Sequence, residues 1–164
     1  MTGAIIELYR RDRAAQELVA EYVGLVALSG FVPYPVFNIA ASAAAQLRMV
    51  QRLARLYEVP LRVEAARAIC GTLLATALPT VATNGLVSLL QPLPWVASTI
   101  GGFALPALLS ASTYALGRTF IQHFEVGGTF LDLDPKAMRA HFDREFASVR
   151  EATPFVATDA GSTR

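Results

Sequence analysis

Charge is absent from one long stretch of the chain, and this absence restricts the structure most. Between Arg67 and Arg118, a stretch of about 50 residues, no side chain is charged. A helix that crosses a bilayer core of roughly 30 Å needs about 20 apolar residues, so the stretch suits two crossings. A turn is predicted at 91–94, where the sequence reads Gln-Pro-Leu-Pro. We therefore expect an all-α protein with a helical membrane hairpin of two transmembrane helices over residues 67–118.

Other scarce residues argue against catalysis and metal binding. Cys70 is the single cysteine, which excludes an internal disulfide and any cysteine-based zinc site. The two histidines, His123 and His141, lie on different predicted helices, whereas a metal site needs three or four converging ligands. The pairs Gly101-Gly102 and Gly127-Gly128 lack the lysine of a phosphate-binding loop. With a net charge of +1 there is also no general attraction for nucleic acid. We expect no enzymatic activity, no cofactor, no metal and no nucleic-acid partner.

The N-terminal segment, residues 1–66, reads as amphipathic helices that flank a second charge-free run at 22–47. Apolar residues recur at helical spacing over 4–23, and the helix is expected to continue to about Ser29. Pro33 and Pro35 then break the apolar run, because proline interrupts the hydrogen bonds of a helix. The sequence leaves open whether 22–47 is a re-entrant segment, an interfacial segment or a third span.

A second helix is predicted from about residue 36 to 57, and its last half is amphipathic with a basic side. The arginines of that side are candidates to meet anionic lipid headgroups, or else form an ordinary solvated helix face. They are Arg48, Arg52 and Arg55.

The C-terminal segment, residues 119–151, is predicted to be helical and cytoplasmic. The second hairpin helix should run past Gly117 and end at Gly127-Gly128, where glycine is a common C-terminal cap. Asp134 and Pro135 fit the N-cap and first position of a last helix. Its apolar stripe is expected to pack against the basic helix that ends at Tyr57, and residues 152–164 are expected to form a disordered tail. The stripe consists of Met138, Phe142, Phe146 and Val149.

Two arguments favour the membrane over a soluble helical assembly. The remaining amphipathic helices are short, and we expect them to be too few to cover two long apolar helices on every side. Arginines also flank both ends of the hairpin while its turn has none, so both ends are expected in the cytoplasm of a bacterium. Small residues spaced by four let helices approach closely in lipid, so they either form a packing seam between copies or reflect only the alanine-rich composition of the stretch. The candidates for this helix-packing seam are Ala107, Ala111 and Ala115.

Several motifs together resemble one family. The residues Gln46-Leu47-Arg48-Met49-Val50 and Leu53-Ala54-Arg55-Leu56-Tyr57 look like its "LQLRMVxRLAxLYG" signature, and Thr113-Tyr114-Ala115-Leu116-Gly117-Arg118 looks like its "TxALGR" motif. Pro33-Tyr34-Pro35, His123-Phe124-Glu125, Gly127-Gly128-Thr129 and Leu131-Asp132-Leu133-Asp134-Pro135 extend the match. On these motifs, over roughly residues 30–147, the chain resembles the bacterial YcjF-like membrane protein family (domain of unknown function 697). Asn38 and Glu58 depart from the aspartate and glycine expected of the family.

The resemblance implies a helical protein of the bacterial inner membrane, often found beside GTPases or stress-response proteins, and it supplies no catalytic residue. We therefore expect a membrane anchor or scaffold for a GTPase or membrane-stress partner that acts in trans, and we expect copies to associate. One alternative is an oligomeric pore or transport protein lined by Thr80, Asn84 and Ser110. The other is a soluble helical assembly without membrane contact.

Overall fold

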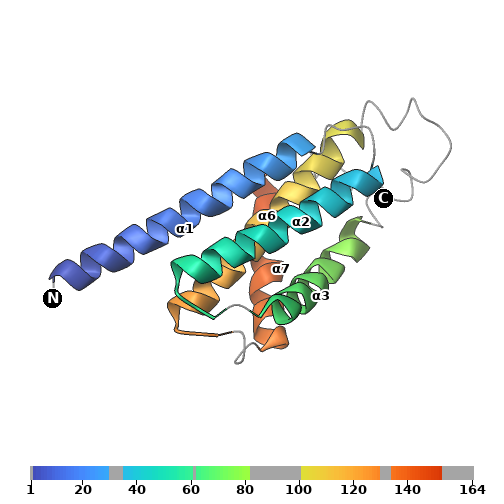
Figure 1. Cartoon of the computed structure of the whole chain (residues 1–164). Helices are drawn as coiled ribbons and strands as arrows, with labels where there is room; N and C mark the ends of the chain where they lie inside the picture. Colours follow the sequence, from blue (N-terminus) through green and yellow to red (C-terminus); the bar gives the residue numbers. More distant parts are fainter. Residues whose placement is uncertain (1, 30–34, 61, 82–100, 130–133, 153–164) are drawn as a thin grey trace.

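The computed structural model describes residues 2–29, 35–60, 62–81, 101–129 and 134–152 (Figure 1). These ranges contain helices and no strand, which confirms the predicted all-α class. The helices are α1 (Thr2–Ser29), α2 (Pro35–Leu56), α3 (Val63–Val81), α6 (Gly101–Glu125) and α7 (Pro135–Ala152). The expected ends at Ser29, near residue 36 and near Glu151 agree with these bounds.

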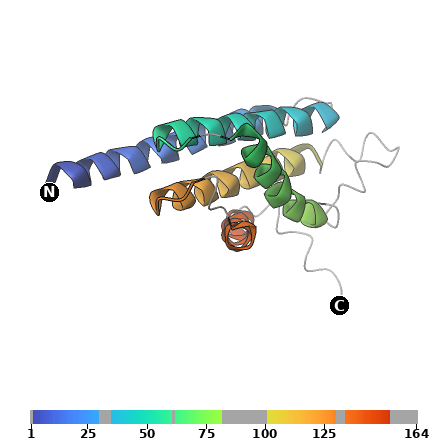
Figure 2. The ribbon, with the colours of Figure 1, turned by 60° about the horizontal axis from the view of Figure 1, so that its bottom comes forward.

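α6 is the central helix of the fold. α1 runs antiparallel to both α2 and α6, and these three helices lie along one direction (Figure 1). α7 crosses them and is seen end-on in Figure 2, while α3 lies obliquely beside α6 and α7. The expectation that too few helices remain to cover the second hairpin arm is wrong for α6 from Pro106 onward. α1, α2 and α7 surround this part, and buried residues occur on every side of it between Leu108 and Phe124.

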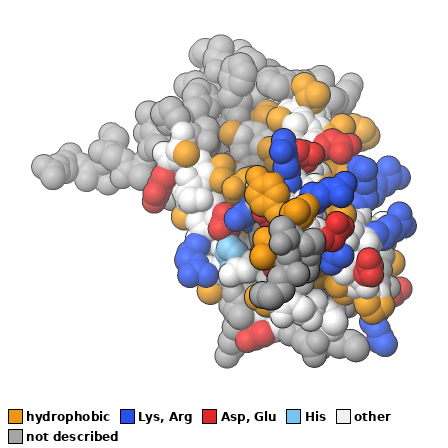
Figure 3. All heavy atoms as spheres, turned by 90° about the vertical axis from the view of Figure 1, so that its left-hand side faces the viewer, with side chains coloured by type: hydrophobic (Ala, Val, Ile, Leu, Met, Phe, Trp, Pro, Cys, Tyr) orange, Lys and Arg blue, Asp and Glu red, His pale blue; other side chains and the backbone are white. Residues whose placement is uncertain are grey.

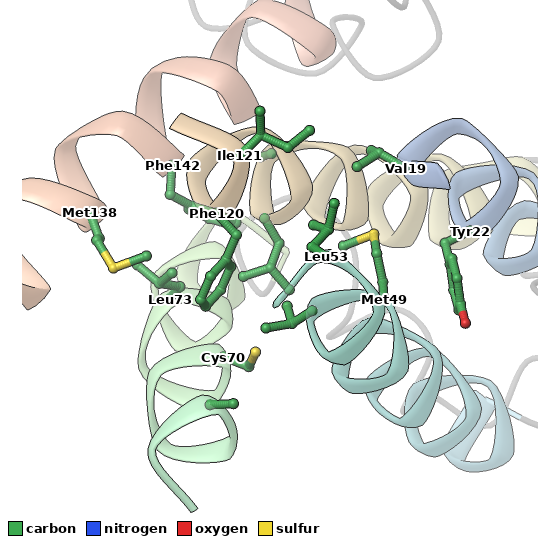
Figure 4. Close-up of a cluster of buried hydrophobic side chains, with 14 of the residues drawn as sticks. Val19, Tyr22, Met49, Leu53, Cys70, Leu73, Phe120, Ile121, Met138 and Phe142 are labelled. Carbon is green, nitrogen blue, oxygen red and sulfur yellow. The ribbon is translucent and has the colours of Figure 1, made fainter. Parts of the chain in front are cut away.

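All five helices contribute to one hydrophobic core (Figure 4). Phe120 of α6 and Phe142 of α7 are its largest buried side chains, and neither is exposed to solvent. Around them lie apolar side chains of the other helices, including Val19, Met49, Leu53, Cys70 and Leu73. A core built from such distant parts of the sequence makes the described helices one packed unit.

The apolar stripe of α7 is buried as the sequence predicted, but its expected partner is wrong. Met138, Phe142 and Phe146 are 4%, 0% and 7% exposed. α7 packs most extensively on α6 and next on α3, rather than on the basic end of α2. The physical reason is that α6 and α3 supply large buried apolar side chains, such as Phe120 and Leu73, to the part of the core where α7 lies (Figure 4).

Both α2 and α6 end in a Schellman motif, in which a left-handed residue closes the helix. At the end of α6 Gly127 has φ 78°, its N–H donates to the Phe124 carbonyl, and the Gly128 N–H donates to the His123 carbonyl. This confirms the glycine cap predicted from the sequence. At the end of α2 the same two bonds form around Glu58, whose φ is 58°. A side chain in this backbone region is strained, since only glycine enters it freely.

Glu58→Gly should therefore stabilise the protein by about 1 kcal/mol, because glycine removes most of the 1–2 kcal/mol cost of a left-handed residue. The substitution loses only a long contact of 3.9 Å between Arg11 and an exposed Glu58, which contributes little. Thermal unfolding measures the effect, with Glu58→Ala as the matched control that removes the charge and keeps the strain. A Glu58→Ala variant as stable as Glu58→Gly would contradict the backbone explanation.

The predicted hairpin is only partly within the described residues. Its turn at 91–94, Trp95 and Asn84 lie outside them, as does the tail 153–164. The described parts of its two arms, α3 and α6, cross obliquely and share few contacts (Figure 2). Among the helices described, none is both long enough and apolar enough to qualify as a membrane span.

Candidate functional site

The fold brings the charge-free runs of three helices together at one end of the molecule. The end of α1, the start of α2 and the start of α6 meet on the right of Figure 1. Side-chain hydrogen bonds set the register of these helices. The Gln46 amide of α2 donates to the Thr113 hydroxyl of α6, and Arg52 of α2 donates to the Glu21 carboxylate of α1 at 3.4 Å. The transition from uncharged to charged residues therefore falls at about the same level in α1, α2 and α6. We call the uncharged part, residues 22–29, 35–47 and 106–117, the charge-free end.

Large apolar side chains are exposed on this charge-free end. Leu25 and Leu28 of α1 are 56% and 71% exposed, and Phe37 and Ile39 of α2 are 59% and 45% exposed. The charge-free end, within the described residues, contains no charged side chain that would keep the surface around these apolar groups hydrated. Large apolar groups of both α1 and α2 are therefore exposed at this end of the described structure.

The inner face of α2 is polar at the same level. Asn38, Ser42 and Gln46 follow one another at intervals of four residues, so they lie on one side of the helix. Each is at most 2% exposed. α2 thus carries polar side chains inward and apolar side chains outward over its first half, the reverse of a helix in a water-soluble protein.

One of the inward polar groups, Gln46, bonds to α6. The Gln46 Nε2 donates to the Thr113 Oγ1 at 3.0 Å and, more weakly, to the Ser112 Oγ at 3.4 Å. Both hydroxyls in turn donate to the Leu109 carbonyl, at 2.7 and 2.9 Å. These bonds join the two helices through groups that would otherwise be costly to bury. The row of polar side chains on α2 was not predicted from the sequence, although polar residues at intervals of four in an alanine-rich helix are visible there.

The predicted basic face borders the charge-free end. Arg48, Arg52 and Arg55 are all exposed on α2. Arg52 also contacts α1, where its guanidinium lies 5.8 Å from the Tyr22 ring centre and 3.4 Å from both Glu21 carboxylate oxygens. The three arginines lie at helical spacing along α2, beginning directly after the charge-free end and continuing for about 10 Å at 1.5 Å per residue.

The predicted small-residue seam lies inside the chain. Ala111 and Ala115 are 5% and 0% exposed, and Ala107 is half-buried. They face the helices that surround α6, so Ala111 and Ala115 have no free surface for a second copy.

The two histidines occupy separate local positions. His123 bonds the Thr129 carbonyl at 3.0 Å, within the turn that follows α6. His141 lies 3.7 Å from Glu145 of the same helix, and burial lowers the pKa of His141. Within the described ranges, no group of three or more His, Cys, Asp and Glu side chains is placed to hold a metal ion.

Comparison with known proteins gives a family and one relative. The family model described as "Domain of unknown function (DUF697)" matches residues 5–151. The chain is 36% identical over 137 residues to a protein of Magnetospirillum gryphiswaldense called "Magnetosome membrane protein 22". The match covers 83% of this chain and 70% of that protein. No solved structure matches the chain.

Proposed function

The chain belongs to the family of domain of unknown function 697, and on this premise we propose that it is a non-enzymatic protein of the bacterial inner membrane that acts as an anchor or scaffold. In this proposal the charge-free end lies in the lipid, and the charged helices form a docking module in the cytoplasm. A GTPase or membrane-stress protein that acts in trans is the partner class we propose for that module. The relative in Magnetospirillum gryphiswaldense is called a magnetosome membrane protein, which supports a membrane location.

The observation that supports this proposal most strongly is the arrangement of α2, with polar side chains facing inward and apolar side chains facing outward. Burying a leucine or phenylalanine side chain is worth roughly 1.5–3 kcal/mol, so lipid around Leu25, Leu28, Phe37 and Ile39 would stabilise the protein considerably. Polar groups within a membrane face the interior of a bundle and bond to one another. Asn38, Ser42 and Gln46 occupy that interior position on α2.

Arginine placement supports an orientation for this end. Arg48 and Arg118 directly follow the charge-free runs of α2 and α6, and cytoplasmic flanks are enriched in such residues. The uncharged part of α2, from Pro35 to Leu47, is about 20 Å long at 1.5 Å per residue. A hydrocarbon core is roughly 30 Å thick, so this part of α2 would enter the bilayer without crossing it.

Environment-sensitive labels test the proposal. Two single-cysteine variants, Leu28→Cys and Val126→Cys, are made in a Cys70→Ala background. Each variant is labelled with nitrobenzoxadiazole and placed in vesicles of phosphatidylethanolamine and phosphatidylglycerol. The two native side chains are 71% and 79% exposed, so they form a matched pair at opposite ends of the molecule. We expect brominated lipid to quench the label at 28 strongly and aqueous iodide to quench the label at 126.

Two outcomes would contradict the membrane proposal. Equal iodide quenching at both positions would place the charge-free end in water. Recovery of the wild-type chain in the supernatant of washed cell membranes would exclude membrane anchoring altogether.

A further inference from the structure

A groove lies at the opposite end of the molecule from the charge-free end. There the first turns of α1 project past the C-terminal ends of α2 and α6 (Figures 1 and 2). The groove has a volume of about 470 Å³ between α1 on one side and Tyr57, Phe124 and Glu125 on the other. It is therefore formed by the ends of three helices that are far apart in sequence.

One wall of the groove is an apolar stripe on α1. Ile5, Leu8 and Tyr9 recur at helical spacing and are 64%, 66% and 67% exposed. The facing wall is formed by the rings of Phe124 and Tyr57, whose centres lie 5.8 Å apart. In Figure 3, which faces this end, hydrophobic side chains gather at the centre and charged side chains surround them. A central apolar surface with a charged rim is typical of a protein-binding site.

Two carboxyl groups meet in the same groove. Asp12 and Glu125 both line it, and the Tyr57 hydroxyl donates to Glu125 at 3.4 Å. Burial and the neighbouring Asp12 charge raise the pKa of Glu125, while the Arg118 charge opposes this effect. Arg11, the only basic residue in the lining, already has other partners: it lies 3.9 Å from Glu58 and over the Tyr57 ring. A cation near both carboxyl groups would therefore relieve their repulsion.

Charge complementarity distinguishes the possible occupants. A second copy that used the same α1 face would bring a second Asp12 toward the first pair of carboxyl groups, and like charges in contact are unfavourable. A partner helix with one basic residue in its apolar face matches both the apolar walls and the carboxyl pair. Binding of an amphipathic helix in an apolar groove is a common mode of recognition.

We propose that this groove docks an amphipathic helix of a partner protein, with one lysine or arginine of that helix placed between Asp12 and Glu125. The apolar side chains of the partner pack against Ile5, Leu8 and Tyr9. The inference rests on the proposed scaffold role, because it names the partner class that the cytoplasmic module recruits.

Synthetic peptides test the inference on the full chain in nanodiscs of phosphatidylethanolamine and phosphatidylglycerol. The probe is a fluorescein-labelled, 18-residue leucine–alanine amphipathic helix with one lysine in its apolar face, compared with the same peptide carrying glutamate. Fluorescence anisotropy should show about tenfold tighter binding of the lysine peptide to wild type, equivalent to about 1.4 kcal/mol. Empty nanodiscs give the contribution of lipid, which is subtracted.

Variants identify the groove as the source of the preference. Asp12→Asn/Glu125→Gln should abolish the preference for lysine, and Glu125→Lys should reduce or reverse it. Glu7→Gln is the matched control, because Glu7 is an exposed acid on the same helix outside the groove lining. Its preference for the lysine peptide should equal that of wild type, and circular dichroism confirms that each variant is folded.

Equal binding of both peptides to wild type, or loss of the preference in Glu7→Gln, would overturn the inference. Self-association of the wild type that Leu8→Glu abolishes would also overturn it, since a second copy would then occupy the groove. The fluorescence labels at 28 and 126 report separately on the membrane proposal, so failure of one proposal is distinguishable from failure of the other.

Discussion

Phe142→Ala is expected to lower the free energy of unfolding by about 3–5 kcal/mol, the usual cost of truncating a buried phenylalanine. Phe142 is fully buried where α7 meets α6 and α3. Its ring stacks on Phe146 of the same helix, with ring centres 5.9 Å apart. Alanine would leave a cavity at this junction, because the surrounding helices are held by their other contacts and relax only in part. Urea unfolding of the detergent-solubilised protein, followed by circular dichroism, measures the loss.

Arg139→Ala is the matched control for this prediction. Arg139 lies on the solvent side of α7 and approaches Asp143 at 4.0 Å, with 62% of its side chain exposed. Exposed ion pairs contribute about 0–1 kcal/mol, so the variant should unfold close to wild type. Protease resistance equal to that of wild type in Phe142→Ala would show that α7 does not depend on this contact.

Local features were predictable because the residues that determine them are neighbours in the sequence. α7 begins at Pro135, and the Met138 N–H donates to the Asp134 carbonyl, as the Asp-Pro start predicted. Gly127 ends α6 for the same local reason, since glycine enters the left-handed conformation at little cost. The stripe of α7 was also predictable, because helical periodicity identifies a buried face without naming its partner.

Long-range pairing was not predictable from these local patterns. The sequence favoured α2 as the partner of α7, whereas α7 packs on α6 and α3, which supply buried side chains such as Phe120 and Leu73. The inside-out face of α2 was missed for a related reason. Asn38, Ser42 and Gln46 stand out only once they are seen to be buried, with Gln46 bonded to a hydroxyl group of α6. The groove was not predictable either, because it forms where α1 projects beyond the shorter helices beside it. The groove places Asp12 near Glu125, although more than 100 residues separate them in the sequence.

Gly117→Ala is expected to destabilise the protein by up to about 2 kcal/mol, although alanine is the better helix former by about 1 kcal/mol. Gly117 is buried in α6 at its closest approach to α1. A Cβ at this position would lie 2.5 and 2.7 Å from the two γ-carbons of Val19, nearer than non-bonded carbons allow. Val19 is 2% exposed, and a valine in a helix is restricted to essentially one rotamer, so it has no room to turn away. The two helices would have to separate, at an overpacking cost of about 1–3 kcal/mol.

The effect of Gly117→Ala on stability should change sign once the Val19 γ-carbons are removed. In a Val19→Ala background the γ-carbons are absent, and Gly117→Ala should then stabilise the protein by up to about 1 kcal/mol through helix propensity. A double-mutant cycle in urea isolates this coupling, because the separate cost of Val19→Ala cancels. Gly71→Ala in α3 is the matched control: nothing lies within 4 Å of a Cβ there, so the substitution should stabilise in either background. If Gly117→Ala stabilised the wild-type chain as much as Gly71→Ala does, the close approach of α1 to α6 at Val19 would be refuted. The shared register of the charge-free runs, which depends on that approach, would then lose one of its supports.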